Sequence, residues 1–431
     1  MVSLGTVRVR QLARNRAERV QYGRWLGNKR VTTEEMSERC GQRVAALCEG
    51  RHILAIQDKS ELNYQKHSNR TRELGTVGNG SDAGLFVHPV LAVDADSGDC
   101  LGLIGAELWL RTKGKAPNYR DLPIEEKESN RWLKGAETAR DRLRDAAHIT
   151  VIADRESDIY EEWARLPNDH LDLLTRACRD RAIAEGGSLF AFLDKLPVEA
   201  CYTFDVPPQP GKRRARRAKM ELRFGAVTIK RPKHCSDPAA PDEITLRVVD
   251  VRETAQSAGQ DTPIHWRLLT THQVETTTQA LQIVGWYSQR WHIEQLFRTV
   301  KRQGFDIEAS EMETGAALLR LAALALQAAA RCMQMVLARD GSSQPATAAF
   351  EPDEIPVLVA LQPTLEGKTE KQRNPHPKTS LAWAAWTIAR LGGWNGYKSE
   401  RPPGPITMLN GLKRFAALAE GWRLANARIP I

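Results

Sequence analysis

Three carboxylates in this sequence, Asp58, Asp154 and Glu294, could together hold a hard divalent cation. Carboxylate oxygens are the ligands that Mg²⁺ and Mn²⁺ prefer, and the sequence places no His or Cys cluster beside these three residues. Two such ions about 3.5–4 Å apart would activate an attacking oxygen and stabilise the leaving oxygen in an in-line displacement at phosphorus. The three residues are therefore the candidate metal ligands and catalytic residues, provided that the fold brings them together.

The two aspartates each follow an apolar run that is typical of a buried strand. Residues 53–56 precede Gln57 and Asp58, and residues 149–153 precede Asp154, after which a helix is expected to start at once. Runs without alternation suit strands that are buried on both faces. We expect both strands to deliver their aspartates to the same edge of one sheet. A single Asp in such a place is more often a helix cap or a turn residue than a ligand.

The third acid lies in WYSQRWHIEQLFRTVK, residues 286–301, which the spacing predicts to be one amphipathic helix. At about 100° per residue, one narrow sector contains Tyr287, Arg290, Glu294 and Lys301. The neighbouring sector already supplies an apolar stripe for packing, made of Trp286, Ile293, Leu296, Phe297 and Val300. The polar stripe would then face a substrate, with Arg290 and Lys301 suited to phosphate oxygens and Tyr287 able to donate or stack. The alternative is an Arg290–Glu294 ion pair worth a few tenths of a kcal/mol.

The composition and net charge of the chain limit the kind of molecule that it is expected to bind. The chain has 431 residues, 42% of them hydrophobic, which suffices for two or three domains with real cores. A net charge of +9 and a pI near 9.2 favour a polyanionic partner, either nucleic acid or an anionic membrane face. The most apolar run, residues 321–338, is interrupted by Arg331, so we expect a core helix and no membrane partner. Seven cysteines without a CxxC pair argue against disulfides and against a zinc site, and fit the cytoplasm.

Two strongly basic segments are candidate DNA contacts. Residues 1–30 carry eight Arg and Lys residues with Tyr22 and Trp25 between them, and a helix is expected to follow from Thr32 or Thr33. The run GKRRARRAK, residues 211–219, precedes strand-like alternation. Either segment could be a solvated arm or hairpin tip, but together they favour contact with phosphates.

The spacing Tyr287-x2-Arg290-x3-Glu294-x6-Lys301 resembles the YREK signature of bacterial DDE transposases of the insertion-sequence-four family, in the branch of the transposon-five transposase. QDKSELNY at the first acid, ADRESDIYE at the second and the KES-x-RWL segment (127–133) add to the resemblance, which covers most of the chain.

The resemblance implies a fold and a division of the chain. The fold would be an α/β ribonuclease-H-like core, a mixed sheet flanked by helices, with an inserted β subdomain and a helical C-terminal region. Its parts would be a basic DNA-binding segment shorter than the family's (1–50), the first part of the core (51–164), the β insertion (165–262), the second part of the core (263–338) and a helical dimerisation region (339–431).

The resemblance also implies an activity. Asp58, Asp154 and Glu294 would bind two Mg²⁺ ions, for which Mn²⁺ could substitute. Water would cleave the transposon end, and the freed 3′-hydroxyl would attack the opposite strand to form a hairpin. The hairpin would then be reopened, and the 3′-hydroxyl would attack target DNA in strand transfer. The partners would be double-stranded DNA, both transposon ends and target, and a second copy in a synaptic homodimer associated with the nucleoid. Trp266 would stack on a flipped base, and Arg298 would contact DNA.

One departure leaves an alternative open. Family members usually carry some forty further residues at the N-terminus that help to recognise the transposon end, and the first twenty or so residues here do not resemble them. A truncated, cleavage-deficient DNA-binding relic or an inhibitor of transposition is therefore the alternative to an active transposase.

Overall fold

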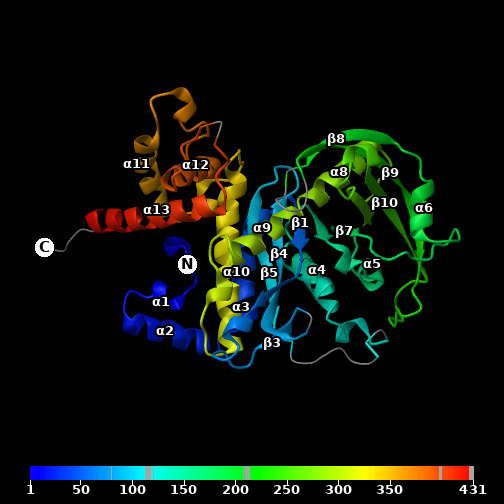
Figure 1. The fold of residues 1–431 in the computed structure, drawn as a ribbon, viewed down its shortest axis with the longest axis horizontal. Coiled ribbons are helices and arrows are strands. Elements are labelled where there is room, and N and C mark those ends of the chain that lie inside the picture. The colour runs from blue at the N-terminus through cyan, green and yellow to red at the C-terminus, as the bar shows by residue number, and fades with distance from the viewer. Residues whose placement is uncertain are drawn as a thin grey trace.

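In the part of the chain that the structure describes, eleven β-strands form one continuous mixed sheet (Figure 1). The computed structural model describes residues 1–78, 80–111, 118–119, 121–206, 208, 214–397 and 400–426. The strands are β1 (His52–Gln57), β2 (Ser60–Asn63), β3 (Gly75–Val77), β4 (Asp82–Asp94), β5 (Cys100–Trp109), β6 (His148–Ala153), β7 (Leu171–Arg176), β8 (Ala200–Val206), β9 (Arg216–Lys230), β10 (Glu243–Glu253) and β11 (His265–Thr270).

Helices cover the sheet and extend beyond it. They are α1 (Val9–Leu12), α2 (Arg16–Gly27), α3 (Thr33–Cys48), α4 (Asn130–Arg142), α5 (Tyr160–Arg165), α6 (Leu189–Lys195), α7 (Ala255–Ala258), α8 (Thr277–Ser288), α9 (Trp291–Lys301), α10 (Gly315–Ala338), α11 (Ile355–Leu365), α12 (Leu381–Leu391) and α13 (Pro405–Asn426). Thr32 caps α3 and Thr276 caps α8, as side-chain oxygens before a first turn should. The predicted mixed α/β sheet flanked by helices is confirmed.

The strand order brings the predicted aspartates to neighbouring strand ends. The path runs β2–β4–β1–β6–β7–β11–β10–β9–β8, and β3 and β5 pair with β4. β6 pairs in parallel with β1 on one side and with β7 on the other. Because parallel strands end at the same edge, the prediction that β1 and β6 point Asp58 and Asp154 to one edge is confirmed.

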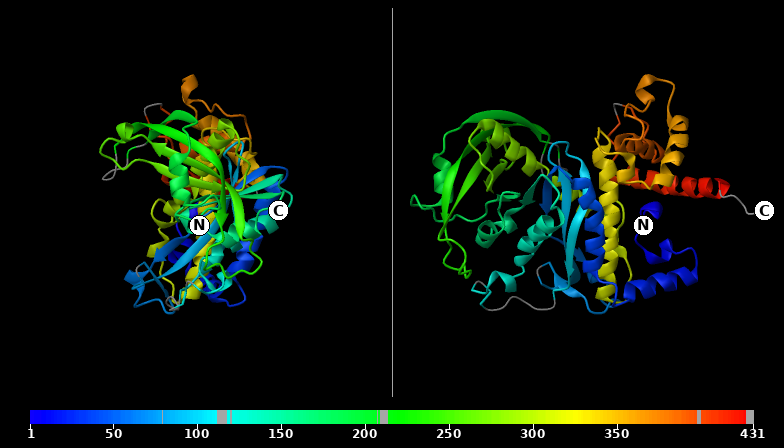
Figure 2. Two further views of the ribbon diagram at one scale, coloured as in Figure 1. Left: turned by 90° about the vertical axis from the view of Figure 1, so that its right-hand side faces the viewer. Right: turned by 180° about the vertical axis from the view of Figure 1, so that it is seen from behind.

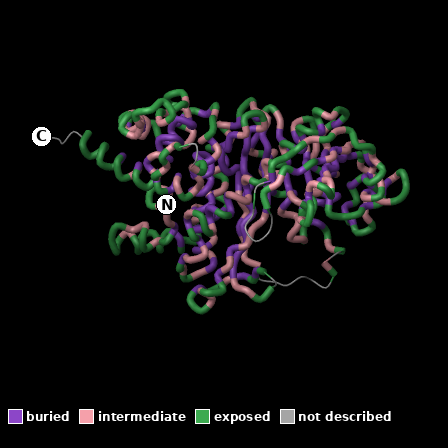
Figure 3. The backbone as a smooth tube through the Cα atoms, turned by 45° about the horizontal axis from the view of Figure 1, so that its top comes forward, coloured by how far each residue is buried: buried purple, intermediate pink, exposed green. Residues whose placement is uncertain are grey.

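Alternation along the central strands divides the core between the two faces of the sheet. Leu54 and Ile56 of β1 and Ile152 of β6 pack in the cluster that contains α8, α9 and α10. Ile53 and Val151 point the other way, into the cluster formed with α4, α5 and α6. In Figure 3 the buried residues accordingly run through the sheet and the helices against it, while the terminal helices are largely exposed.

Helix α10 links the sheet to the helices at the C-terminus. Figure 2 shows it standing between the sheet and the C-terminal helices α11–α13. Its length and hydropathy would allow it to cross a membrane, but 78% of the relevant window is buried inside the protein. The predicted core helix is therefore confirmed. Near its N-terminus Arg320 donates to the carbonyls of Leu26, at 2.8 Å, and Val31, at 2.5 Å, and so fixes the basic N-terminal segment to the core.

The predicted insertion continues the main sheet. β8, β9 and β10 are antiparallel neighbours, and β10 pairs with β11 in the register Val251↔Trp266. β7 also lies within residues 165–262, and it is a central strand between β6 and β11. The predicted domain boundaries stay predictions.

Only part of the basic run 211–219 is available for DNA. Residues 211–213 lie outside the described residues. Arg216 is held by ion pairs with Glu253 and Asp261, both at 2.7 Å, so it is not free for phosphate. Arg214 and Arg217 are exposed.

A buried acid stabilises the turn that follows β6. Glu162 on α5 is fully buried and accepts a hydrogen bond from the Ser157 hydroxyl. Burial, with a further contribution from the charge of Asp158, raises the pKa of Glu162 from 4.5 to about 8. Glu162 is therefore protonated in the folded protein at neutral pH.

The contribution of Glu162 to the free energy of unfolding should consequently fall as pH rises from about 4.5 to about 8. In that window the unfolded chain loses the Glu162 proton while the folded chain keeps it, at a cost of at most about 1.4 kcal/mol per pH unit. Histidines whose pKa values burial lowers, such as His52 and His272, act in the opposite direction over part of this range. The test is therefore a comparison: in urea denaturation, the free energy of unfolding of Glu162→Gln should have a more positive slope against pH than that of the wild type. Glu156→Gln, which changes a half-exposed neighbour, should keep the wild-type slope. Equal slopes in all three proteins would contradict a protonated Glu162.

Candidate active site

Asp58 and Asp154 occupy equivalent positions beyond two paired strands. In the parallel register Ile56 lies opposite Ile152, and each aspartate comes two residues later. Residues two apart in a strand share a face, so both carboxylates project from the side of the sheet that α8 and α9 cover. Asp154 also accepts from the Glu156 backbone N–H at 2.7 Å and caps the short helical turn Arg155–Ser157. Asp154 is thus both a helix cap and one of the three candidate metal ligands.

Arg290 joins the sheet edge to the helix that carries the third acid. One guanidinium nitrogen lies 2.8 Å from Asp58 Oδ2, and the other lies 3.3 Å from Glu294 Oε1. Glu294 is in the first turn of α9, one turn after Arg290, so the two side chains are i,i+4 neighbours. The structure therefore brings Asp58, Asp154 and Glu294 around one cation, and the Arg290–Glu294 pair that was the alternative interpretation is part of this cluster.

Burial, more than repulsion between the carboxylates, makes this site favour proton uptake. Burial and then the negative charge of Asp154 raise the pKa of Asp58 to about 7, although Arg290 and the Lys59 backbone N–H act in the opposite direction. Burial also raises the pKa of Asp154. A hard divalent cation between these oxygens would remove the repulsion without a proton. The residues present thus fit the Mg²⁺ or Mn²⁺ set that the sequence predicted.

Residues 128–332, a little under half of the chain, match the family model described as the transposase DDE domain. The match supports a DDE transposase. Its range contains Asp154 and Glu294, while Asp58 lies before it. A cryo-EM structure of the piggyBac transposase synaptic complex with hairpin DNA is similar over 88% of this chain and 55% of that one, so the chain spans about half of that protein. The identity is 12% and the TM-score 0.34, a likeness too low to support an argument.

The prediction that residues 286–301 form a single helix is wrong. α8 ends at Ser288 and α9 begins at Trp291, with a tight turn between them. In that turn the N–H of Gln289 bonds to Trp286 O at 3.0 Å and the N–H of Arg290 to Tyr287 O at 3.1 Å, which are i→i−3 contacts. The polar residues therefore do not form one straight stripe. The turn instead places Arg290 at the start of α9, between the two acids it bridges.

Tyr287 lies beside the carboxylate cluster, and Trp266 lies beside Tyr287. Tyr287 is buried, and burial raises the pKa of its hydroxyl. Its ring meets that of Trp266 edge to face, with centroids 5.3 Å apart. Trp266 on β11 is half-buried, so part of the residue stays accessible.

The other two predicted DNA contacts lie further along α9. Burial lowers the pKa of Lys301, with Glu308 and Glu61 acting in the opposite direction. Arg298 is exposed and packs over the ring of Trp291 at 4.9 Å. The structure thus gathers Tyr287, Arg290 and Trp266 around the acids and leaves Arg298 on the surface; their roles toward DNA stay predictions.

Sequence analysis missed a second polar cluster at the other edge of this sheet. His52, His148 and His272 each offer one ligand atom within 4.8 Å of the others. A signal was present, because RHILAIQD and AHITVIAD both place a histidine six residues before the aspartate. The pairing of these two histidines follows from the β1–β6 register, and the third comes from a distant segment.

Arg290→Gln should lower the free energy of unfolding in metal-free buffer by roughly 3 kcal/mol, because two partly buried carboxylates lose their cation. Mn²⁺ should recover more stability in this variant than in the wild type, since it no longer competes with the guanidinium. The measurement is urea denaturation with EDTA and with Mn²⁺.

Arg298→Gln is the matched control, because its guanidinium rests on Trp291 and makes no ion pair among the described residues. It should change stability little and leave the Mn²⁺ response as in the wild type. If Arg290→Gln behaved like this control, Arg290 would not be the cation that holds the cluster together.

Proposed function

We propose that this chain is a metal-dependent DNA transposase of the insertion-sequence-four type that performs cut-and-paste transposition. The observation that carries the proposal is the meeting of Asp58, Asp154 and Glu294 around Arg290 at one sheet edge. The transposase DDE match over 128–332 supports the same chemistry. The β5–β4–β1–β6–β7 portion would be the ribonuclease-H-like core.

The reaction divides between the bound ions and the side chains of the chain. Mg²⁺ or Mn²⁺, when bound, would supply activation of the attacking oxygen and neutralisation of phosphate charge. Asp58, Asp154 and Glu294 would hold the ions in a partly buried, low-dielectric setting, where charge interactions are stronger than in water. Arg290, released from Asp58 as the ions enter, would be free to contact a non-bridging phosphate oxygen.

The same site would serve every step in turn. Water would be the nucleophile in the first cleavage, and the 3′-hydroxyl that this cleavage frees would attack the opposite strand to form the hairpin. Water would then reopen the hairpin, and the 3′-hydroxyl freed again would be the nucleophile in strand transfer. Each step is a displacement at phosphorus, so the carboxylates need not be rearranged between steps. The substrate would be double-stranded DNA, first the transposon end and then the target.

The N-terminal helices offer a basic surface for the DNA backbone. Exposed side chains on α2 and just after it include Arg16, Arg19, Arg24, Lys29 and Arg30. Tyr22 and Trp25 are about 40% exposed among them, so aromatic stacking is available beside the positive charge. The apolar side chains of Leu418, Trp422 and Leu424 are exposed on α13, which fits a synaptic homodimer through the C-terminal helices.

The first test is cleavage of a labelled duplex that carries the flanking end of the protein's own element, with Mn²⁺. The wild type should give a hairpinned product and a flank-free end. Glu294→Gln should reduce the rate roughly 100-fold or more, since loss of a metal ligand should cost at least as much as loss of an outer-shell partner. Glu275→Gln, an exposed acid on the connection before α8, should leave the rate unchanged.

A protein that binds this duplex without cutting it would overturn the active-transposase proposal. That outcome would instead favour the alternative hypothesis, a cleavage-deficient DNA-binding relic or an inhibitor of transposition. Cleavage that is equal in the wild type and Glu294→Gln would instead reject the three-carboxylate site.

Trp266 provides a separate test of the step that flips a base. Trp266→Ala should slow hairpin formation on normal DNA about 10-fold or more, because base stacking is worth about 1–3 kcal/mol. Trp266→Phe keeps an aromatic face and should recover most of the rate. First-strand nicking, followed on a denaturing gel, should change little in either variant. Equal rates for the Ala and Phe variants would assign Trp266 to packing against Tyr287.

A further inference from the structure

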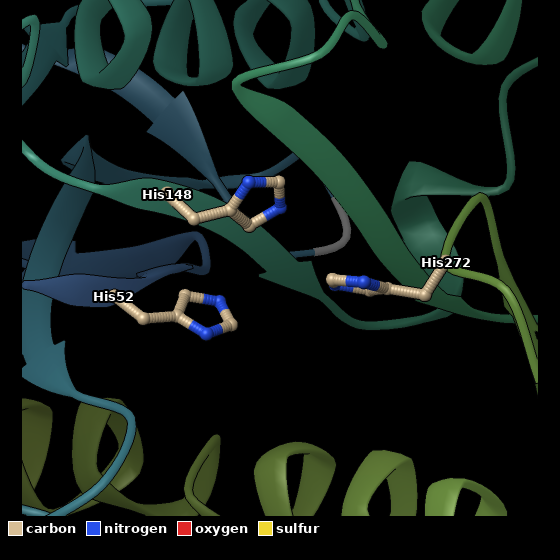
Figure 4. A group of neighbouring side chains, drawn as sticks. All are labelled: His52, His148 and His272. Carbon is tan, nitrogen blue, oxygen red and sulfur yellow. The ribbon is translucent and has the colours of Figure 1, made fainter.

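Three imidazoles meet at the edge of the sheet opposite the carboxylates (Figure 4). His52 is the first residue of β1, His148 is the first residue of β6, and His272 follows the end of β11. The figure shows the three rings approaching a common space from two strands and one connecting segment. One ligand nitrogen of each ring lies within 4.8 Å of one nitrogen of each other ring.

The register of the paired strands brings the three histidines close together. His52 lies directly opposite His148 in the parallel β1–β6 pair. β7 continues the parallel set with Thr150 opposite Asp172, and β11 runs antiparallel to β7, so its end returns to the edge where β7 begins. The cluster is roughly 20 Å from Asp58, six residues away at about 3.3 Å each. It is therefore a site distinct from the carboxylate cluster.

Hydrogen bonds to one carboxylate and one hydroxyl group fix the orientation of the imidazole rings. Asp172 Oδ2 lies 3.0 Å from His148 Nε2 and 3.1 Å from His272 Nδ1. Asp172 is itself held by the hydroxyl of Thr271, which donates to Oδ1 at 2.6 Å. Partners of this type, a carboxylate bonded to imidazole nitrogens, orient histidines that bind metals.

Thr150 links the third ring to the others. Its hydroxyl oxygen lies 2.8 Å from His52 Nε2 and 2.7 Å from His272 Nε2. The other nitrogen of His52, Nδ1, makes no hydrogen bond that the structure records within the described residues. A ring held through one nitrogen can offer the lone pair of the other.

The cluster is reachable from solvent, and two of its rings have lowered pKa values. Burial and the neighbouring imidazoles lower the pKa of His52 to about 4, and burial likewise lowers that of His272 to about 4. Neutral imidazole is the form that coordinates metals. The side chains of His148 and His272 are 25% and 14% exposed, so an ion has access from solvent. Trp286 covers the inner side, with its ring centroid 4.8 Å from that of His52.

We propose that His52, His148 and His272 bind one borderline divalent transition-metal ion of the Zn²⁺ class, with Asp172 as a positioning residue. Imidazole nitrogen is a preferred ligand of such ions, whereas Mg²⁺ prefers the carboxylates at the opposite edge. Zn–N bonds of about 2.0–2.1 Å would place the three nitrogens about 3.4 Å apart. The present separations are at most 4.8 Å, so they would shorten by up to about 1.4 Å. His272 would exchange its contact with the Thr150 hydroxyl for the ion and keep the one with Asp172. Three protein ligands would leave the remaining position to water.

The position of the site indicates a structural role. The ion would join the starts of β1 and β6 to the connection between β11 and α8. That connection leads to the helices that carry Tyr287, Arg290 and Glu294. Binding at His272 would therefore fix the segment that leads into α8, the helix that precedes the one carrying Glu294.

Co²⁺ titration of the full-length, metal-stripped protein tests the site, with excess Mg²⁺ present to occupy the carboxylates. The wild type should bind one equivalent with the visible absorption bands of Co²⁺ in a low-symmetry nitrogen-ligand site, and Zn²⁺ should displace it. His148→Ala and His272→Ala should each lose the bands. His234→Ala should keep them, because that ring is a surface histidine paired with Asp121. Glu294→Gln should also keep them, so the result does not depend on transposase activity.

Absence of the bands in the wild type would overturn the proposal, as would bands that survive in His148→Ala or vanish in Glu294→Gln. Thermal melting gives a second readout if an alanine variant fails to fold. Zn²⁺ should raise the Tm of the wild type above its value in EDTA, because an ion that binds only the folded state stabilises it. His272→Asn should melt as the wild type does in EDTA and show no rise with Zn²⁺. An equal rise in both proteins, or none in the wild type, would leave a hydrogen-bonded histidine network without a metal.

Discussion

The burial of neighbouring carboxylates, which adds desolvation to their repulsion, is the constraint on which the active-site half of this protein depends. Asp58 and Asp154 are held side by side because parallel strands end together, and burial then raises the pKa of both groups. In the metal-free protein Arg290 offsets part of this repulsion by pairing with Asp58 and Glu294. Keeping these carboxylates ionised costs free energy when no cation is near them. A bound divalent cation lowers that cost, so the site is suited electrostatically to Mg²⁺ or Mn²⁺.

The turn between α8 and α9 is what allows Arg290 to make both contacts. Its i→i−3 hydrogen bonds end one helix and begin the next within two residues. Upstream of the turn, Trp286 packs near the histidines; downstream, Glu294 reaches the acids. The two helices therefore span the sheet face from its histidine edge to its carboxylate edge. The apolar residues between the two edges, Leu54 and Ile56 among them, give this face the burial that holds the helices in place.

The sheet joins regions that composition alone would separate. The strands predicted as an insertion hydrogen-bond to β11, and β11 pairs with β7 of the central parallel set. Trp266 on β11 consequently stands beside Tyr287 and not in a remote domain. A substrate strand that enters near the acids would meet this pair of rings, which is why Trp266 is a sensible residue to test for base stacking.

Much of the site was predictable because it depends on local patterns. Apolar runs that end in aspartate predicted β1 and β6, and the Arg290–Glu294 spacing predicted that these two side chains share a helical face. Periodicity could not reveal the break at Gln289, because the residues on both sides are compatible with helix and the break is set by packing against the sheet. It also could not reveal the histidine cluster, whose third member comes from more than a hundred residues away.

The sequence by itself determined which residue types could bind a hard cation and that the apolar runs before the two aspartates would be strands, and its net charge favoured a polyanionic partner. Tertiary structure alone decided that three carboxylates meet around one guanidinium and that three imidazoles meet at the other edge. The physical reason is that propensity and alternation act within a few residues. Distances between segments are set by strand register and by the packing of helices on the sheet.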